Sequence, residues 1–380
     1  MNNTNNLKAV VAGHVCLDIT PVFPQNNATL SDVMVPGRLT NVGVSDIHTG
    51  GAVSNTGLAM QFFGADTVLM GKIGDDDFGK IVRDRYHAHG IADSMIVSSD
   101  STSYSVVLAV PGSDRIFLHH TGANDTFCFD DLDFSKIADA KLFHFGYPPL
   151  MRSMYADGGS ELLRIFQKVD ELGVVTSLDM AAVDANSPAG RADWEGILSR
   201  VLPHVDLFVP SVEELCYMLD RERYADWLQR ANGKDVTRFI SVSRDIVPLG
   251  EKLLQMGAKV VLIKSGAPGL YYCTAGTDAI AKIEKKLGFA LEGFADRSGF
   301  ERSYEAECVR SGTGAGDTSI AAFLTAVLKG YSFDTCVQLA VGAGTCCVSA
   351  YDALSGLLPF DAMLKKIEAG WPKENIPVIE

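Results

Sequence analysis

The sequence lacks the features that mark membrane-spanning and secreted proteins. No apolar run approaches the ~18 residues that a helix needs to cross a bilayer. The first residues, Met1 to Asn6, are polar and have neither the basic nor the apolar region of a signal peptide. We therefore expect a cytoplasmic protein that makes no contact with a membrane.

Organised cysteine spacing is also missing. The eight cysteines are scattered along the chain, and none belongs to a Cys-x-x-Cys pair. Zinc sites and disulfide frameworks both depend on such spacing. The pattern favours buried free thiols in a reducing compartment.

Positive charge is scarce relative to negative charge. The 33 lysines and arginines stand against 47 aspartates and glutamates, which gives a net charge of −14 at pH 7. An acidic surface repels phosphate backbones and anionic lipids, so we expect no nucleic acid partner. Hydrophobic residues make up 47% of the chain, which is typical of a folded globular protein.

Short apolar segments alternate with amphipathic ones along most of the chain. Between residues 161 and 172, for example, Leu162, Ile165, Phe166 and Val169 share one helical face. We predict strands at 9–12, 67–70, 141–145, 174–178, 206–209 and 259–263, and helices at 57–63, 161–172, 194–202, 212–219 and 248–256. This alternation indicates an α/β fold whose mostly parallel sheet is covered by helices on both faces.

Two segments depart from this alternation. Residues 102–110 alternate with a period of two, residues 111–114 have the composition of a turn, and residues 115–121 resume the strand pattern. Residues 18–50 have no helical period. We expect 18–50 and 102–122 to form a small antiparallel β lid that projects from the core. Such a sheet usually packs on a ligand or a partner subunit, so it could close over a substrate or join a homodimer.

Small and acidic residues follow the predicted strands. In an open parallel sheet, ligands bind beyond the carboxyl ends of the strands. The residues at those ends are Asp18, Gly146, Asp179, Ser211 with Glu214, and Ser265 with Gly266. Asp179 could border a ligand there or cap the strand.

A glycine-rich segment, Ser311 to Asp317, precedes a strongly apolar helix. Small residues at a helix start let backbone amides and the helix dipole converge on an anion. Asp317 would then lie beside that anion. The alternative is a glycine-rich turn in which Asp317 is an ordinary N-cap.

A second glycine-rich segment runs from Gly50-Gly51 through Asn55 to Gly79. The paired glycines allow close backbone packing, and Asn55 offers a donor and acceptors on the first helical turn. We interpret Asp75, Asp76 and Asp77 as turn or helix-capping residues and not as a metal site.

The two segments resemble the two signatures of the ribokinase-like (PfkB) family of sugar and nucleoside kinases, and they occur along the chain in the same order as in that family. Four further landmarks match the family, at residues 13–18, 122–124, 210–214 and 264–269. The resemblance covers about residues 8–360. It implies one kinase domain over 1–380, with a three-layer α/β/α sandwich, a β lid, and transfer of a phosphoryl group from ATP to a hydroxyl of a small carbohydrate.

The resemblance also implies roles for particular residues. Asp317 matches the catalytic base. The other implied sets are the anion hole (Gly314, Ala315, Gly316), the sugar site (Asp18, Gly50, Gly51, Asn55), the nucleotide site (Ser265, Gly266, Gly269, Thr313) and Glu214, which would act on Mg²⁺ through water.

The sequence departs from the family pattern at three places. Ser311 stands where the family often has an aspartate of a monovalent-cation site, so we expect little activation by K⁺. Ser211 replaces the usual asparagine before the metal-organising acid. Residues 276–306 are rich in lysine and arginine, and we interpret them as an irregular, solvated insertion.

Other functions remain as alternatives. A nucleoside kinase would need an aromatic platform, for which Tyr104, Phe117 and Phe23 are candidates. A relative that binds ligands without turnover is a second alternative, although the segment around Asp317 is intact. A nicotinamide dehydrogenase is disfavoured because no Gly-x-Gly-x-x-Gly follows the first strand. His119 and His120 alternate, so at most one of them faces the substrate.

Overall fold

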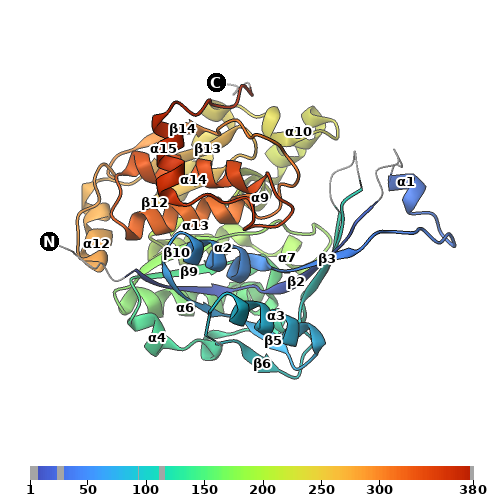
Figure 1. The fold of residues 1–380 in the computed structure, drawn as a ribbon. Coiled ribbons are helices and arrows are strands. Elements are labelled where there is room, and N and C mark those ends of the chain that lie inside the picture. The colour runs from blue at the N-terminus through green and yellow to red at the C-terminus, as the bar shows by residue number, and fades with distance from the viewer. Residues whose placement is uncertain (1–6, 24–29, 93, 111–115, 377–380) are drawn as a thin grey trace.

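The computed structural model describes residues 7–23, 30–92, 94–110 and 116–376 (Figure 1). Within these ranges, eight strands form the central sheet in the order β14 (Ser298–Arg302), β13 (Gly269–Thr274), β12 (Val260–Lys264), β11 (Leu207–Phe208), β10 (Val175–Asp179), β9 (Leu142–Gly146), β1 (Lys8–Gly13) and β4 (Asp66–Met70). All six strands predicted from the sequence are confirmed, and none of their ends moves by more than one residue.

The sheet is mostly parallel and is buried on both faces. The six strands β4, β1, β9, β10, β11 and β12 run parallel to their neighbours, whereas β13 and β14 add antiparallel pairs at one edge. On β1, Ala9 and Val11 join one hydrophobic core, while Val10 and Ala12 join the other. Strands buried on both faces need apolar side chains in both directions, which is why these segments read as continuous apolar runs.

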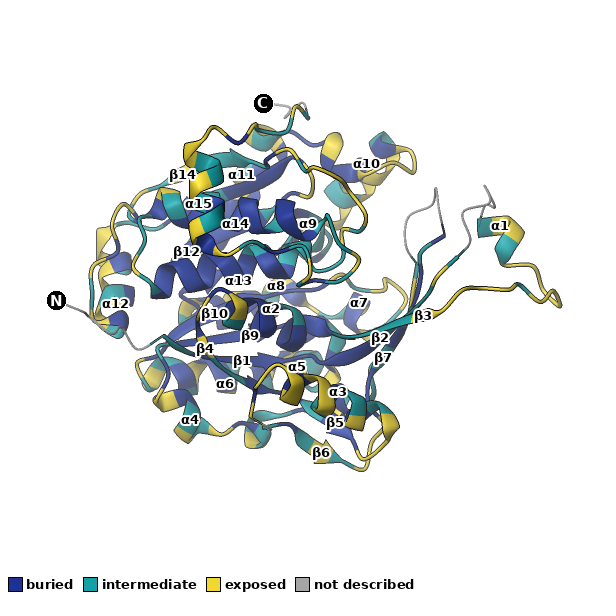
Figure 2. Cartoon of the chain, viewed as in Figure 1, coloured by how far each residue is buried: buried dark blue, intermediate teal, exposed yellow. Residues whose placement is uncertain are grey.

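Helices cover the two faces and complete the predicted three-layer sandwich (Figure 2). One layer contains α2 (Gly51–Phe62), α12 (Thr277–Leu287), α13 (Ala315–Leu328), α14 (Phe333–Cys347) and α15 (Phe360–Glu368). The other contains α4 (Phe134–Ala138), α5 (Arg152–Tyr155), α6 (Ser160–Glu171), α8 (Trp194–Val201), α9 (Val212–Leu219), α10 (Arg221–Ala231) and α11 (Val247–Gln255). None of the helices in the described ranges is long and apolar enough to span a bilayer.

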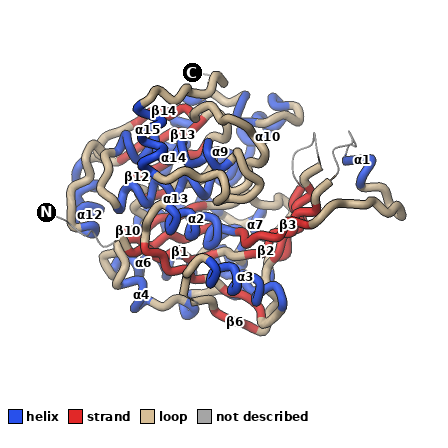
Figure 3. Tube along the Cα trace, viewed as in Figure 1, coloured by secondary structure: helices blue, strands red, loops and turns tan. Residues whose placement is uncertain are grey.

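A second sheet projects from the sandwich as the expected lid (Figure 3). Its strand order is β3 (Ser45–Gly50), β2 (Cys16–Pro21), β7 (Tyr104–Leu108) and β8 (Ile116–His120). The pairs β2–β3 and β7–β8 are antiparallel, but β2 and β7 are parallel, so the expectation of a purely antiparallel lid is wrong. Segments that follow one another in the sequence suggest antiparallel hairpins, such as β2–β3 and β7–β8. The parallel pair of β2 and β7 instead needs a long crossover connection, which the local sequence does not reveal. The turn predicted at 111–114 lies outside the described residues.

Smaller elements fill the region around the lid. A short helix, α1 (Leu30–Val33), lies toward the tip of the lid (Figure 1). Beneath the lid, α3 (Asp77–Ala88) packs against β2 and against β5 (Lys72–Gly74), which pairs with β6 (Ile96–Ser98). The predicted helix at 57–63 is the second half of α2, which begins earlier, at Gly51.

Residues 276–306 contain α12 and β14, which are part of the sandwich, so their interpretation as an irregular solvated insertion is wrong. α12 buries Ile280, Ile283 and Leu287 against the core, and β14 pairs with β13 to extend the central sheet. The three buried positions have helical spacing, but the charged residues between them obscure it in the sequence.

Candidate active site

The glycine-rich segment leads directly into α13. Gly314 has a φ of 74°, a left-handed conformation that favours glycine, and a Cβ on it would lie 2.5 Å from the Cβ of Ala353. Because α13 begins at Ala315, the N–H groups of its first turn have no partner within the helix. The helix dipole adds positive potential at the same point. This is the local geometry that an anion hole requires.

Asp317 lies in the first turn of α13 and is only 4% exposed. Its Oδ2 accepts a hydrogen bond from Asn55 Nδ2 at 3.0 Å, and its Oδ1 accepts from Tyr147 Oη at 2.7 Å and Thr56 Oγ1 at 3.4 Å. The N-cap position belongs to Gly314. The reading of Asp317 as an ordinary N-cap is therefore wrong, because its carboxylate joins α13 to α2 and to the end of β9.

An ion pair lies at the carboxyl ends of β10 and β12. Asp179 Oδ1 lies 2.7 Å from Lys264 Nζ. Burial raises the pKa of Asp179 to about 8; Lys264 opposes this rise, whereas Glu214 and Asp317 add to it. A Cβ on Gly316 would lie 3.8 Å from Lys264 Nζ, so this ammonium is next to the start of α13. Asp179 thus borders the site and does not merely cap its strand.

A cavity of about 740 Å³ lies between the lid and the segment before α13. Asp18 lines it from β2, Asn55 from α2 and Thr313 from the glycine-rich segment. Asn55 also donates to Asp317, which places that carboxylate beside the cavity. Burial raises the pKa of Asp18, and Cys16 Sγ donates a hydrogen bond to its Oδ1 at 3.3 Å.

The paired glycines join β3 to α2 at the base of the lid. Gly51 has a φ of 81°, and a Cβ on it would lie 2.6 Å from His14 Nδ1. A Cβ on Gly50 would overlap the carboxylate of Asp18. Gly51 therefore needs glycine, and the Asp18 carboxylate packs directly against the backbone of Gly50, at the end of the cavity that Asp18 lines.

The predicted nucleotide residues of the 264–269 segment form the turn between β12 and β13. The Ser265 N–H donates to the Gly269 carbonyl at 2.8 Å, and the Gly269 N–H donates to the Gly266 carbonyl at 3.2 Å. Lys264, immediately before this turn, contacts the position of Gly316. The turn thus lies on the β12 side of the α13 start, and Thr313 lies in the cavity wall.

Glu214 lies in the first turn of α9. Its Oε2 accepts a hydrogen bond from the Ser211 N–H at 2.8 Å, as the third residue of a capping box. Its charge also acts on Asp179 and Lys264. Within the described ranges, no group of three or more His, Cys, Asp or Glu side chains could hold a metal ion by itself.

The two lid histidines do face opposite ways, as the alternation predicts. His119 Nε2 lies 3.3 Å from His14 Nε2, and its Nδ1 lies 3.0 Å from Ser105 Oγ. His120 instead contacts Ser101 Oγ at 2.9 Å. Burial lowers the pKa values of His14 and His119, so both are neutral near pH 7.

The aromatic residues proposed as a platform for a nucleobase do not all lie at the cavity, and the aspartates of the 75–77 segment lie away from it. Phe23 lines the cavity, whereas Tyr104 packs against Phe78 with 5.6 Å between ring centroids. Phe117 is 51% exposed. Asp76 is the N-cap of α3 and accepts from the Gly79 N–H at 2.8 Å, which confirms the capping interpretation of that segment.

Sequence reasoning missed Tyr147, Thr56 and Lys264. Gly146 was recognised as the end of a strand, but Tyr147 directly after it was not. The signal that could have found it is its position: it follows the carboxyl end of a buried strand and precedes Pro148-Pro149, which fix a turn there.

Comparison with known proteins gives a consistent result. The chain matches the family described as pfkB family carbohydrate kinase over residues 8–359. An uncharacterized sugar kinase of Archaeoglobus fulgidus is 22% identical over 301 residues, which are 79% of this chain and 98% of that protein.

Two solved structures share the fold. Arabidopsis thaliana ribokinase, complexed with ribose and ATP, aligns with a TM-score of 0.66 at 20% identity and covers 94% of this chain and 97% of its own. A protein of E. coli provisionally assigned as ribokinase II, in complex with ATP and Mg²⁺, aligns with a TM-score of 0.68 at 18% identity and covers 95% of this chain and 99% of its own.

Proposed function

The chain belongs to the pfkB family of carbohydrate kinases, and we propose that it transfers the γ-phosphoryl group of ATP to a hydroxyl of a small sugar with Asp317 as the base. The observation that carries this assignment is the position of Asp317. A nearly buried carboxylate, aligned by hydrogen bonds from Asn55 and Tyr147, lies one residue after the helix-start amides and beside the cavity.

The proposed step needs positioning and charge stabilisation more than covalent chemistry. The sugar hydroxyl gives its proton to Asp317 as its oxygen attacks the γ-phosphorus. The new P–O bond forms while the bond from the γ-phosphorus to the bridging oxygen breaks, and ADP leaves. The helix-start N–H groups assigned to the anion hole, at Gly314, Ala315 and Gly316, would stabilise the charge on the transferred group.

The cavity beside Asp317 suits the sugar. Its volume, about 740 Å³, is within the ordinary range for small-molecule sites. Asp18 and Asn55 can bind sugar hydroxyls, and the close packing at Gly50 and Gly51 brings backbone to the same end. The lid strands form the opposite wall.

The nucleotide is assigned to the other side of the α13 start. Ser265, Gly266 and Gly269 would bind it from the β12–β13 turn. Thr313, which lines the sugar cavity, would contact it from the segment before α13. ATP binds together with Mg²⁺, and the bound ion would neutralise part of the negative charge of the phosphates. Glu214, in the first turn of α9, would hold such an ion through water.

Three finer expectations remain predictions. They are a homodimer joined through the lid, a cytoplasmic location and one domain over the whole chain. Exposed apolar side chains on the lid, Phe117 at 51% and Leu118 at 53%, support a role for this sheet in packing.

The test is an ADP-release assay over ketoses, aldoses, sugar acids, sugar phosphates and nucleosides at fixed MgATP. We expect sugar-dependent turnover with one small carbohydrate. Turnover with a nucleoside and no sugar would support the nucleoside kinase alternative. Ligand binding without ADP release from any compound would instead indicate a non-catalytic relative.

A further inference from the structure

Tyr147 has an unusual backbone conformation. Its φ is 68° and its ψ is 43°, which is left-handed, although it is a bulky aromatic residue and is followed by Pro148. Aromatic residues rarely adopt this conformation, and a residue before proline is normally extended. Strained positions of this kind persist where the surrounding structure fixes them, and they cluster at functional sites.

The neighbouring structure holds Tyr147 from several sides. Its N–H donates to the carbonyl of Asp179 at 3.3 Å, and its carbonyl accepts from the Leu150 N–H at 3.0 Å. The following residues form a short 3-10 helix, Pro148–Leu150, in which both prolines are buried. The ring of His14 lies 5.9 Å from the tyrosine ring, between centroids.

The left-handed turn directs the tyrosine hydroxyl to a residue 170 positions away. Tyr147 Oη donates to Asp317 Oδ1 at 2.7 Å, the shortest of the three hydrogen bonds to that carboxylate. Burial, with the nearby charges of Asp317 and Asp179, raises the pKa of Tyr147, so the hydroxyl keeps its proton and can only donate to the carboxylate.

The two oxygens of Asp317 therefore have different surroundings. Oδ1 accepts from Tyr147 and Thr56, on the sandwich side. Oδ2 accepts from Asn55, which lines the cavity. From this asymmetry we infer that Tyr147 is a positioning residue: its hydroxyl fixes Oδ1 so that Oδ2 faces the cavity and takes the proton of the acceptor hydroxyl. The inference rests on the proposed kinase function.

The test is Tyr147→Phe, which keeps the ring and removes the hydrogen bond. We expect kcat to fall by about 10- to 100-fold, the size of a lost hydrogen bond to a charged group. KM for sugar and for ATP should change by less than twofold, because Tyr147 does not line the cavity. Tyr271→Phe is the matched control, since Tyr271 is also buried and its Oη lies 3.0 Å from Ser298 Oγ, in the pair of β13 with β14. We expect it to retain the wild-type kcat.

A double-mutant cycle separates positioning from a general loosening of the fold. If Tyr147 acts through Asp317, Tyr147→Phe should have no further effect in single-turnover assays of Asp317→Asn. An equal loss of rate in both backgrounds, or a kcat within twofold of wild type in the single variant, would overturn the inference. Absence of any sugar-dependent turnover by the wild-type protein would instead overturn the proposed function.

Discussion

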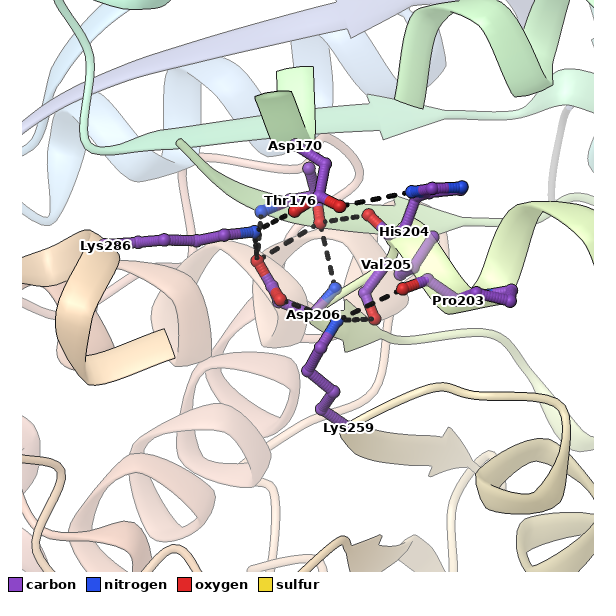
Figure 4. A network of polar contacts seen from close by, with 8 residues as sticks. All are labelled: Asp170, Thr176, Pro203, His204, Val205, Asp206, Lys259 and Lys286. Atoms are coloured by element: carbon purple, nitrogen blue, oxygen red, sulfur yellow. Dashed lines mark hydrogen bonds and ion pairs between the residues drawn. The ribbon is translucent and has the colours of Figure 1, made fainter. Parts of the chain in front are cut away.

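Lys286 Nζ lies 2.7 Å from Asp206 Oδ2, in a buried network at the amino end of the central sheet (Figure 4). Asp206 is fully buried, and Lys259 Nζ lies 2.9 Å from its other oxygen. The same Lys286 ammonium lies 2.7 Å from Asp170 Oδ1 on α6. This network ties α12 to the opposite helical layer, at the end of the sheet away from the candidate active site.

Lys286→Met should therefore destabilise the fold without affecting the chemistry. Removing one partner leaves part of the buried charge on Asp206 uncompensated, and we expect a loss of about 2–3 kcal/mol in the free energy of unfolding. Lys285→Met, on the exposed face of α12, is the control and should change stability by less than about 0.5 kcal/mol. Urea unfolding gives both values, and equal stability of the two variants would contradict this account.

Asp18→Asn should weaken sugar binding specifically. A site built to pair hydroxyl groups loses about 1–3 kcal/mol when one partner is removed, so KM for the sugar should rise by roughly 10- to 100-fold. KM for ATP should stay within twofold, because Asp18 lies on the lid side of Asp317. Asp66→Asn, at the exposed start of β4, serves as the control. Equal increases in both KM values would show that Asp18 has a structural role instead.

His144 should contribute to unfolding in acid. Burial, together with the charge of Lys264, lowers the pKa of His144 to about 3. Below pH 6.5 the unfolded chain binds a proton that the folded chain excludes, so the free energy of unfolding falls as the pH drops toward 3. The contribution is on the order of 4 kcal/mol over that range.

Unfolding measured between pH 7 and pH 4 tests this expectation. His144→Gln should show a shallower loss of stability than wild type, whereas His87→Gln, at an exposed position of α3, should follow the wild-type curve. An unchanged slope for His144→Gln would exclude this histidine as a source of acid sensitivity.

Monovalent cations should have little effect on the rate. Ser311 offers a neutral hydroxyl, which donates to Thr313 Oγ1 at 2.9 Å and accepts from the Thr313 N–H at 3.1 Å. A K⁺ ion there would have no carboxylate from residue 311. The measurement is a rate series in Tris buffer at constant ionic strength, in which K⁺ replaces tetramethylammonium. A many-fold increase in rate with K⁺ would show that another acid replaces the missing one.

The sequence predicts the central sheet well because its information is local. A buried parallel strand is a short apolar run that can be recognised from its own residues. Asp179 and Gly314 could be found in this way, because strand ends and helix starts are marked by adjacent residues.

Contacts between distant segments could not be predicted in the same way. The parallel pairing of β2 with β7 depends on a crossover through the core, and the docking of α12 depends on Lys286 meeting Asp206, 80 residues away. Tyr147 reaches Asp317 only because its backbone is left-handed, and its residue type alone would not predict that conformation.

The most direct test of the central claim is the kcat of Asp317→Asn. Asparagine keeps the size of the side chain and an acceptor oxygen but cannot take a proton, so kcat should fall by about 10²–10⁴-fold. Calorimetric affinities for sugar and MgATP and the unfolding midpoint should stay near wild type. Asp334→Asn, in the exposed first turn of α14, is the control and should keep full activity. A kcat for Asp317→Asn near the wild-type value would contradict the assignment of Asp317 as the base.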